Sequence, residues 1–366
     1  MISLAQLSRD VRLGERVDSL AAMVGRTPLI EVWYNSRRRA RRVFAKYEQK
    51  NMTGSVKDRM AMHILRRASA SGDLLPGDTI AEASSGNTGI SFAAMGRALG
   101  HPVRIYIPDW MSPERLALLG SMGAEVMRVS SGQGGFRGSI ALADAFARER
   151  AAAGDRVFLP HQFENDANVE AHELTTGPEI VAQMEARGLR ADAFVAGVGT
   201  GGTVMGVRRA LNWWWPETLV YAMEPANSPT LRTGRKEGTH RIQGVSDEFI
   251  PSIVKLDQLD GVVDVWDGDA ILMAQALGRA GLAVGISSGA NFLAADALLD
   301  QLGDDARVVT VFPDSNKKYL STDLCREEPV RDGYRAPAVE LRWWDALGCE
   351  PCCDRSGACF RPVPRP

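Results

Sequence analysis

A lysine directly after a glycine-containing loop is the first residue that could do chemistry. Residues 51–59 read NMTGSVKDR, which places Lys57 in the first turn of an expected helix. The positive end of the helix dipole disfavours an ammonium group there and favours the neutral amine that attacks an aldehyde. A surface lysine paired with a carboxylate would have the same local sequence. Lys57 therefore needs support from other motifs.

Two further loops could bind anions. Residues 84–89 read SSGNTG and lie between an expected strand and a helix, where backbone N–H groups and the hydroxyls of Ser85 and Thr88 could hold a carboxylate. Residues 197–203 read GVGTGGT, and their glycines would let the backbone approach a phosphate closely. This second loop lacks the lysine of a nucleotide P-loop and the spacing of a dinucleotide-binding loop. Ordinary helix capping or tight packing would explain either loop alone.

A pair of serines completes the set. Residues 285–291 read GISSGAN, and Ser287 offers a neutral hydroxyl just before an expected helix. Together the four segments supply an amine for an aldehyde, a carboxylate site, a phosphate site and a hydrogen-bonding hydroxyl. Pyridoxal phosphate requires these groups from a protein.

The elements that must position these loops alternate between strands and helices from about residue 42 to residue 312. Short β-branched runs predict strands over 43–47, 79–83, 103–107, 125–129, 157–159, 193–196, 219–223 and 308–312. Amphipathic stretches predict helices over 56–70, 87–99, 113–123, 136–153, 202–212, 269–279 and 290–302. We expect an α/β protein with open, mostly parallel twisted sheets flanked by helices, and ligands at the carboxyl ends of the strands.

The composition agrees with a folded enzyme. The 366 residues include 45% hydrophobic and 24% charged residues, with a formal net charge of -2 that does not favour nucleic acid or acidic membranes. The arginine-rich run 37–42 is interpreted as a solvated bend between two strands rather than a polyanion site. No apolar stretch is long enough for a membrane span and no signal peptide is evident, so we expect a cytoplasmic protein.

The C-terminal segment differs from the rest. The strand–helix alternation stops after Ser321, and all five cysteines lie at residue 325 or beyond. Four thiols are close enough in sequence to share a metal, at Cys349, Cys352, Cys353 and Cys359. Their irregular spacing and the absence of a nearby histidine favour no metal. The alternatives are a redox role, or a partly ordered tail whose Trp343 and Trp344 pack on the body or on a dimer partner.

The four motifs, in this order, resemble the cysteine synthase and cystathionine β-synthase family of fold-type II pyridoxal-phosphate enzymes. The resemblance extends from about residue 24 to residue 322 and includes QFEN at 162–165 and TTGPE at 175–179. The segment PDSNKKYL at 313–320 resembles a branch that includes S-sulfocysteine synthases. The resemblance implies two sheets arranged as in the tryptophan synthase β chain. It assigns a smaller α/β domain to 48–165, a larger cofactor domain to 20–47 and 166–325, and a Cys-rich tail to 326–366.

The resemblance also implies roles for individual residues. Lys57 would carry the cofactor as an internal aldimine, Asn87 would bond to the ring oxygen, and Ser287 would meet the pyridine nitrogen. The phosphate would be held by Gly199, Thr200, Gly201, Gly202 and Thr203. The substrate carboxylate would be bound by Ser84, Ser85, Gly86, Thr88 and Gln162.

The activity implied by the resemblance is β-replacement on an O-activated L-serine, carried out by a homodimer. A sulfur nucleophile, sulfide or thiosulfate, would give cysteine or S-sulfocysteine. Asp247 and Glu248 near the expected entrance argue against a phosphorylated serine, whereas Arg241 and the basic cluster 232–236 argue for one. The alternatives are a serine or threonine dehydratase, a threonine synthase or another lyase, or a catalytically silent relative that acts as a binding module.

Overall fold

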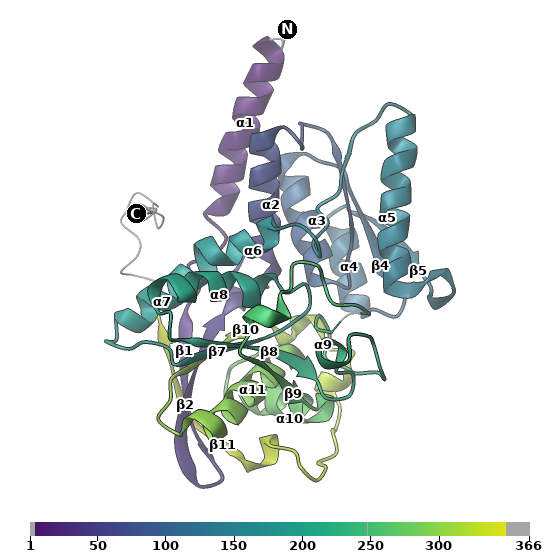
Figure 1. The fold of residues 1–366 in the computed structure, drawn as a ribbon. Helices are drawn as coiled ribbons and strands as arrows, with labels where there is room; N and C mark the ends of the chain where they lie inside the picture. Colours follow the sequence, from purple (N-terminus) through teal and green to yellow (C-terminus); the bar gives the residue numbers. More distant parts are fainter. Residues whose placement is uncertain (1–3, 247, 349–366) are drawn as a thin grey trace.

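Two sheets organise the chain, which is described here for residues 4–246 and 248–348 of a computed structural model (Figure 1). The larger sheet contains β1 (Leu29–Ser36), β2 (Arg39–Tyr47), β7 (Ala193–Gly197), β8 (Leu219–Pro225), β9 (Gly261–Val265), β10 (Val308–Phe312) and β11 (Val339–Leu347). The smaller sheet contains β3 (Thr79–Ala83), β4 (Val103–Pro108), β5 (Glu125–Val129) and β6 (Val157–Phe158). The strand orders are β11-β1-β2-β10-β7-β8-β9 and β5-β4-β3-β6.

Most neighbouring strands are parallel. All pairs in the smaller sheet and the run from β2 to β9 in the larger one are parallel, whereas β1 is antiparallel to both β2 and β11. Parallel strands require crossover connections, and helices supply most of them here. The expected α/β class with two open, mostly parallel sheets is confirmed.

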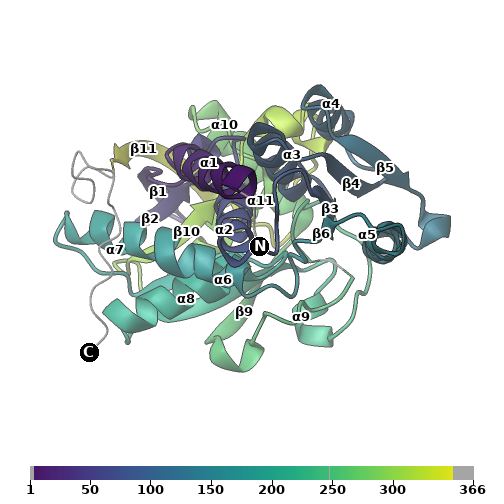
Figure 2. The same cartoon turned by 90° about the horizontal axis from the view of Figure 1, so that it is seen from above.

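Helices cover both faces of each sheet (Figures 1 and 2). Those of the first half are α1 (Leu4–Ala21), α2 (Lys57–Ser71), α3 (Asn87–Leu99), α4 (Pro113–Ser121), α5 (Gly135–Ala152) and α6 (Ala167–Ala171). Those of the second half are α7 (Gly177–Glu185), α8 (Gly202–Trp214), α9 (Thr230–Thr233), α10 (Asp267–Arg279) and α11 (Ile286–Leu302). A π-helix over His172–Thr176 joins α6 to α7.

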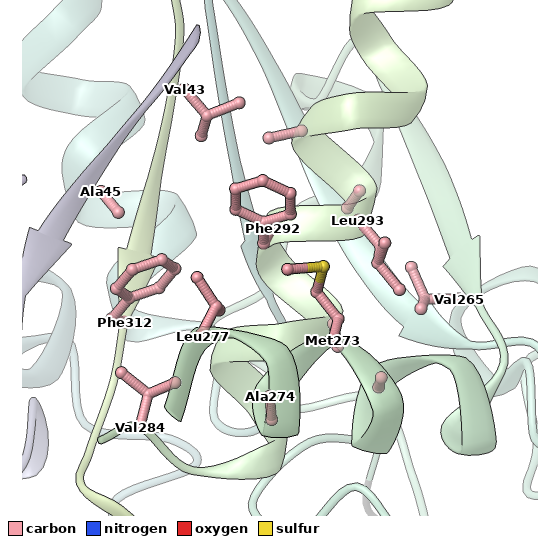
Figure 3. Close-up of a cluster of buried hydrophobic side chains, with 14 of the residues drawn as sticks. Val43, Ala45, Val265, Met273, Ala274, Leu277, Val284, Phe292, Leu293 and Phe312 are labelled. Atoms are coloured by element: carbon pink, nitrogen blue, oxygen red, sulfur yellow. The ribbon is translucent and has the colours of Figure 1, made fainter. Parts of the chain in front are cut away.

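Three large apolar clusters hold these layers together. In the first, α10 and α11 pack on one face of the larger sheet, with Met273, Leu277 and Phe292 against Val43 and Phe312 (Figure 3). In the second, α7 and α8 cover the opposite face of that sheet. In the third, α1 to α4 cover one face of the smaller sheet. Burial of apolar area on both faces explains why the central strands are continuous hydrophobic runs.

The bend predicted for the arginine-rich run 37–42 is confirmed only for its first two residues, because residues 39–42 belong to β2. Arg37 and Arg38 form the turn between β1 and β2 with positive φ angles of 49° and 66°. Arg41 is buried and forms ion pairs with Asp296, Asp300 and Asp304. This cluster joins β2 to α11 and to the loop after it.

The segment expected to be an appendage contributes a strand to the body. β11 pairs with β1 along its whole length, and the indole Nε1 of Trp344 donates to the carbonyl oxygen of Ala280 at 2.9 Å. Trp343, the neighbouring residue, is exposed. The expectation of an appendage from residue 326 is therefore wrong for 339–347, because a strand that pairs with a distant partner gives little local signal.

In the described ranges 4–246 and 248–348, no helix is both long and apolar enough to cross a bilayer.

Candidate active site

One pocket, located where the loops after several strands meet, collects residues from all four motifs. Its lining includes the predicted site residues Lys57, Ser85, Asn87, Thr88, Gln162, Gly199, Thr200, Thr203 and Ser287. The other predicted residues, Ser84, Gly86, Gly201 and Gly202, lie behind the lining in the same two loops.

Lys57 is the first residue of α2 and lines the pocket half-buried. The loop before it is attached to the larger sheet, because the backbone N–H of Val56 donates to the carbonyl oxygen of Pro313 at 2.8 Å. Asp58 points away from the lining into a buried site, where it accepts bonds from the hydroxyls of Thr53 and Ser91, both at 2.6 Å. These contacts fix the start of α2 and hence the direction from which Lys57 enters the pocket.

The glycine-rich loop connects β7 to α8. A side chain on Gly199 would overlap the carbonyl oxygen of Gly244, and one on Gly202 would overlap the amide of Asn168. Gly201 has a φ of 89°, which favours glycine. The first N–H groups of α8 have no earlier carbonyl in the helix to bind, so this loop is suited to a phosphate group. The residues present therefore fit the anionic end of pyridoxal phosphate.

A buried histidine lies next to this loop. The hydroxyl of Thr203 lies 3.3 Å from Nε2 of His172, whose Nδ1 lies 2.8 Å from the hydroxyl of Thr176. Burial, together with the positive charge of Arg59, lowers the pKa of His172 to about 3. His172 is thus neutral at physiological pH and adds no charge to the phosphate loop.

The serine-rich loop connects β3 to α3 and faces Gln162. The hydroxyl of Thr88 donates to Oε1 of Gln162 at 2.7 Å, and Nε2 of Gln162 donates to the carbonyl oxygen of Ala83 at 2.7 Å. Ser84 is buried, and its hydroxyl accepts from the backbone N–H groups of Gly86 and Gly89. Ser84 therefore shapes the loop, while the side chains of Ser85 and Thr88 reach the pocket.

Ser287 lies in the first turn of α11, 5% exposed and in the lining. Asn291, one turn later, donates to the carbonyl oxygen of Val311 and accepts from the N–H of Gly197. These bonds attach the start of α11 to β10 and β7. The positive end of the α11 dipole disfavours a positively charged group beside Ser287.

Several residues of the site were not predicted. Arg115 is 2% exposed and lines the pocket, and its Nε and Nη1 have no hydrogen-bond partner within the described part of the chain. Its guanidinium lies over the ring of Tyr319, 4.9 Å from the ring centre. Asn168 lies behind the lining and donates to Thr200 and to the carbonyl oxygen of Gln162, so it joins the glycine-rich loop to the segment that carries Gln162. Local sequence does not reveal that Arg115 turns toward the pocket or that Asn168 joins the two segments.

The four cysteines considered as possible metal ligands all lie near the C-terminus. Cys349, Cys352, Cys353 and Cys359 lie outside the described residues. Within residues 4–246 and 248–348, no group of three or more His, Cys, Asp or Glu side chains could hold a metal ion.

The sequence profile of the family described as pyridoxal-phosphate dependent enzyme matches residues 20–314, a stretch that includes Lys57 and every other lining residue. The chain belongs to this family. It is accordingly a pyridoxal-phosphate enzyme, and the expected cofactor is confirmed.

Individual family members resemble this chain over most of its length. A cysteine synthase of Staphylococcus aureus is 40% identical over 309 residues, which cover 84% of this chain and 97% of that protein. The crystal structure of a hydrogen sulfide-producing enzyme from Fusobacterium nucleatum has a TM-score of 0.88 and 50% identity, and covers 91% of this chain and 99% of that one. A cysteine synthase from Entamoeba histolytica has a TM-score of 0.77 at 32% identity, and covers 87% and 93% of the two chains. The enzyme is therefore of the cysteine synthase type, and the expected resemblance is confirmed.

Proposed function

We propose that this enzyme replaces the β-substituent of an O-activated L-serine by a sulfur nucleophile. The observation that carries the proposal is the pocket that contains Lys57, the phosphate loop at 199–203, and the hydroxyl and amide groups of Ser85, Thr88 and Gln162. An amine, an anion site for the cofactor and a second anion site for the substrate are the minimum for amino-acid chemistry with pyridoxal phosphate. The names of the cysteine synthase relatives support the same reaction.

Each proposed role follows from the position of the residue. When bound, pyridoxal phosphate withdraws electrons from the Cα of an attached amino acid. Lys57 takes the Cα proton and later returns it, because its amine is the basic group at the start of α2. Ser85, Thr88 and Gln162 hold the carboxylate, and the buried charge of Arg115 near Ser85 adds to the attraction. Ser287 would donate a hydrogen bond to the ring nitrogen without protonating it, which would make the ring a weaker electron sink and favour β-elimination over transamination.

The entrance favours an acetylated over a phosphorylated serine. Arg241 is paired with Asp267, Asp323 and Glu328. The basic cluster is also neutralised by neighbouring acids, in the pairs Arg232 with Glu224, Arg235 with Glu237, and Lys236 with Glu248. The basic residues that argued for a phosphorylated substrate therefore have partners, while Asp247 lies outside the described residues. We propose O-acetylserine as the first substrate and sulfide or thiosulfate as the second.

A second candidate reaction is the release of hydrogen sulfide from cysteine at the same site. The 50% identity to the hydrogen sulfide-producing enzyme of Fusobacterium nucleatum favours it. Both reactions remove a β-substituent from an amino acid held by its carboxylate, so they need the same residues. A cytoplasmic location and a homodimeric assembly complete the proposal.

The test is to mix purified holoenzyme separately with O-acetylserine, O-phosphoserine, L-cysteine and L-serine. The absorption spectrum of the cofactor is followed before and after sulfide or thiosulfate is added. We expect O-acetylserine to change the spectrum and sulfide or thiosulfate to restore it with formation of cysteine or S-sulfocysteine. Sulfide release from cysteine alone would support the second candidate. Pyruvate formation from L-serine, with no response to O-acetylserine, would instead identify a dehydratase.

A further inference from the structure

The side-chain amide of Asn87 is held between two groups of opposite character. Its Nδ2 donates to Oδ2 of Asp314 at 2.8 Å, and its Oδ1 accepts from Nζ of Lys318 at 2.8 Å. Asn87 begins α3 on the smaller sheet, whereas Asp314 and Lys318 follow β10 of the larger sheet. The contacts therefore join the two sheets at the pocket.

These partners determine which way the amide points. A lysine ammonium only donates hydrogen bonds and a carboxylate only accepts them, so the oxygen of Asn87 must face Lys318 and the nitrogen must face Asp314. The hydroxyl of Tyr319 also donates to Oδ2 of Asp314 at 2.8 Å, in agreement with an accepting carboxylate. The amide nitrogen carries two hydrogens, and Asp314 uses one. The second remains for a ligand in the pocket.

Lys318 is buried, and the burial of a lysine side chain has a cost in free energy. It is 3% exposed and Asp314 is fully buried, although a charged group loses much hydration when it leaves water. The adjacent Lys317 is exposed, so the chain itself shows that a lysine here could face solvent. A buried lysine bonded to an asparagine of the pocket lining indicates a role in the site.

We infer that Lys318 and Asp314 are positioning residues that fix the amide of Asn87 with an N–H directed at the ring oxygen of pyridoxal phosphate. This inference rests on the proposed place of Asn87 in the site. A donor at the ring oxygen stabilises its deprotonated form. If the amide were free to turn over, its own oxygen would face the ring oxygen and favour the protonated form.

The experiment compares four variants of the holoenzyme, Lys318→Met, Lys318→Arg, Lys317→Met and Asn87→Ala. Two properties are measured, the affinity for pyridoxal phosphate and the balance between the absorption bands of the deprotonated and protonated ring oxygen. We expect Lys318→Met to shift the balance toward the protonated form and to weaken cofactor binding about tenfold. Lys318→Arg keeps a donor and should retain most of the native balance. Lys317→Met should match the native protein.

The outcomes separate this inference from the site assignment. If Asn87→Ala shifts the spectrum but Lys318→Met matches Lys317→Met, the inference is overturned and the site assignment stands. If Asn87→Ala itself leaves the spectrum unchanged, the proposed place of Asn87 is wrong and the inference falls with it. Should Lys318→Met fail to fold, Asp314→Asn provides the second test, because it removes the obligate acceptor and should produce the same spectral shift.

Discussion

Glu82 lies in β3, two residues before the serine-rich loop. It is buried, and its carboxyl group faces backbone N–H groups. Its Oε1 accepts from the N–H of Ala83 at 2.8 Å and its Oε2 from the N–H of Gln162 at 3.3 Å. Burial raises the pKa of Glu82 from 4.5 to about 8, since two N–H groups offset only part of the lost hydration. The carboxyl group is therefore largely protonated in the folded protein at neutral pH.

This protonation makes stability depend on pH. Between pH 4.5 and pH 8 the folded state binds a proton at Glu82 that the unfolded state has released, so the stability contributed by the protonated group is lost as pH rises. Glu82→Gln removes the ionisable group, but its NH2 group replaces one of the two oxygens that accept a backbone N–H bond, at a cost that does not depend on pH. We predict that the free energy of unfolding of Glu82→Gln, relative to that of the native protein, rises by about 4 kcal/mol between pH 4 and pH 7.5.

Urea unfolding at the two pH values measures this effect. The matched control is Glu149→Gln on the exposed surface of α5, for which no such pH dependence is expected. If the difference in stability between Glu82→Gln and the native protein is the same at both pH values, Glu82 is ionised in the fold and the prediction is wrong.

Residue types and spacing predict the polar residues that are carried on local motifs, but not those that reach the site through tertiary structure. Lys57, Asn87 and Ser287 each belong to a loop whose composition is unusual by itself. Arg115 and Lys318 belong to segments that resemble any helix start or charged turn. Both residues are buried because α4 and the segment after β10 pack at the smaller sheet. Local sequence does not encode this packing.

At the scale of elements, the turn from β7 into α8 has a strict steric requirement. Gly199→Ala would push the loop away from Gly244, because the added methyl group overlaps a backbone oxygen that has no freedom to rotate. We predict that this variant binds pyridoxal phosphate at least about tenfold more weakly while the fold is retained. Fluorescence titration of the apoenzyme with the cofactor measures the effect.

The control for this variant is Gly278→Ala in α10, where an added methyl group meets no atom within 4 Å. It should bind the cofactor as the native protein does. Equal affinity for the Gly199→Ala and Gly278→Ala proteins would contradict a phosphate site in this turn.

The edge strand β11 gives a second prediction about elements. Trp344 packs against the cluster under α10 and α11 and bonds to Ala280, whereas Trp343 is 68% exposed. We predict that Trp344→Ala lowers the free energy of unfolding by about 2 kcal/mol, and that Trp343→Ala changes it by less than about 0.5 kcal/mol. Denaturant titration distinguishes them. Equal effects would mean that Trp344 does not pack on the body in the way described above.

The central strands and long helices could be predicted because their signals are local. The runs 79–83 and 308–312 match the observed strands, since buried parallel strands are short apolar runs between polar loops. The run 125–129 also matches a strand, although β5 is a mostly exposed edge strand. β9 and β11 were missed because both are half-exposed and mix charged with apolar residues. α7 was missed because the π-helix before it and Pro178 obscure the helical period.

At the scale of the whole molecule, the site exists only because two sheets present their loops to each other. The smaller sheet supplies Asn87, Thr88 and Gln162, and the larger one supplies the phosphate loop and Ser287. The amine that joins them, Lys57, lies on the connection from β2 to the smaller sheet. The order of the motifs predicts this convergence only through the family resemblance, because spacing alone does not fix how two sheets meet.

The most direct test of this account is to identify the lysine that carries the cofactor. Two lysines are candidates by position, since Lys57 lines the pocket and Lys318 contacts Asn87 beside it. Borohydride reduction of the holoenzyme fixes the cofactor to its lysine, and proteolysis with mass spectrometry locates it. We predict a phosphopyridoxyl group on Lys57 and none on Lys318. Modification of Lys318, or of no lysine, would contradict the account.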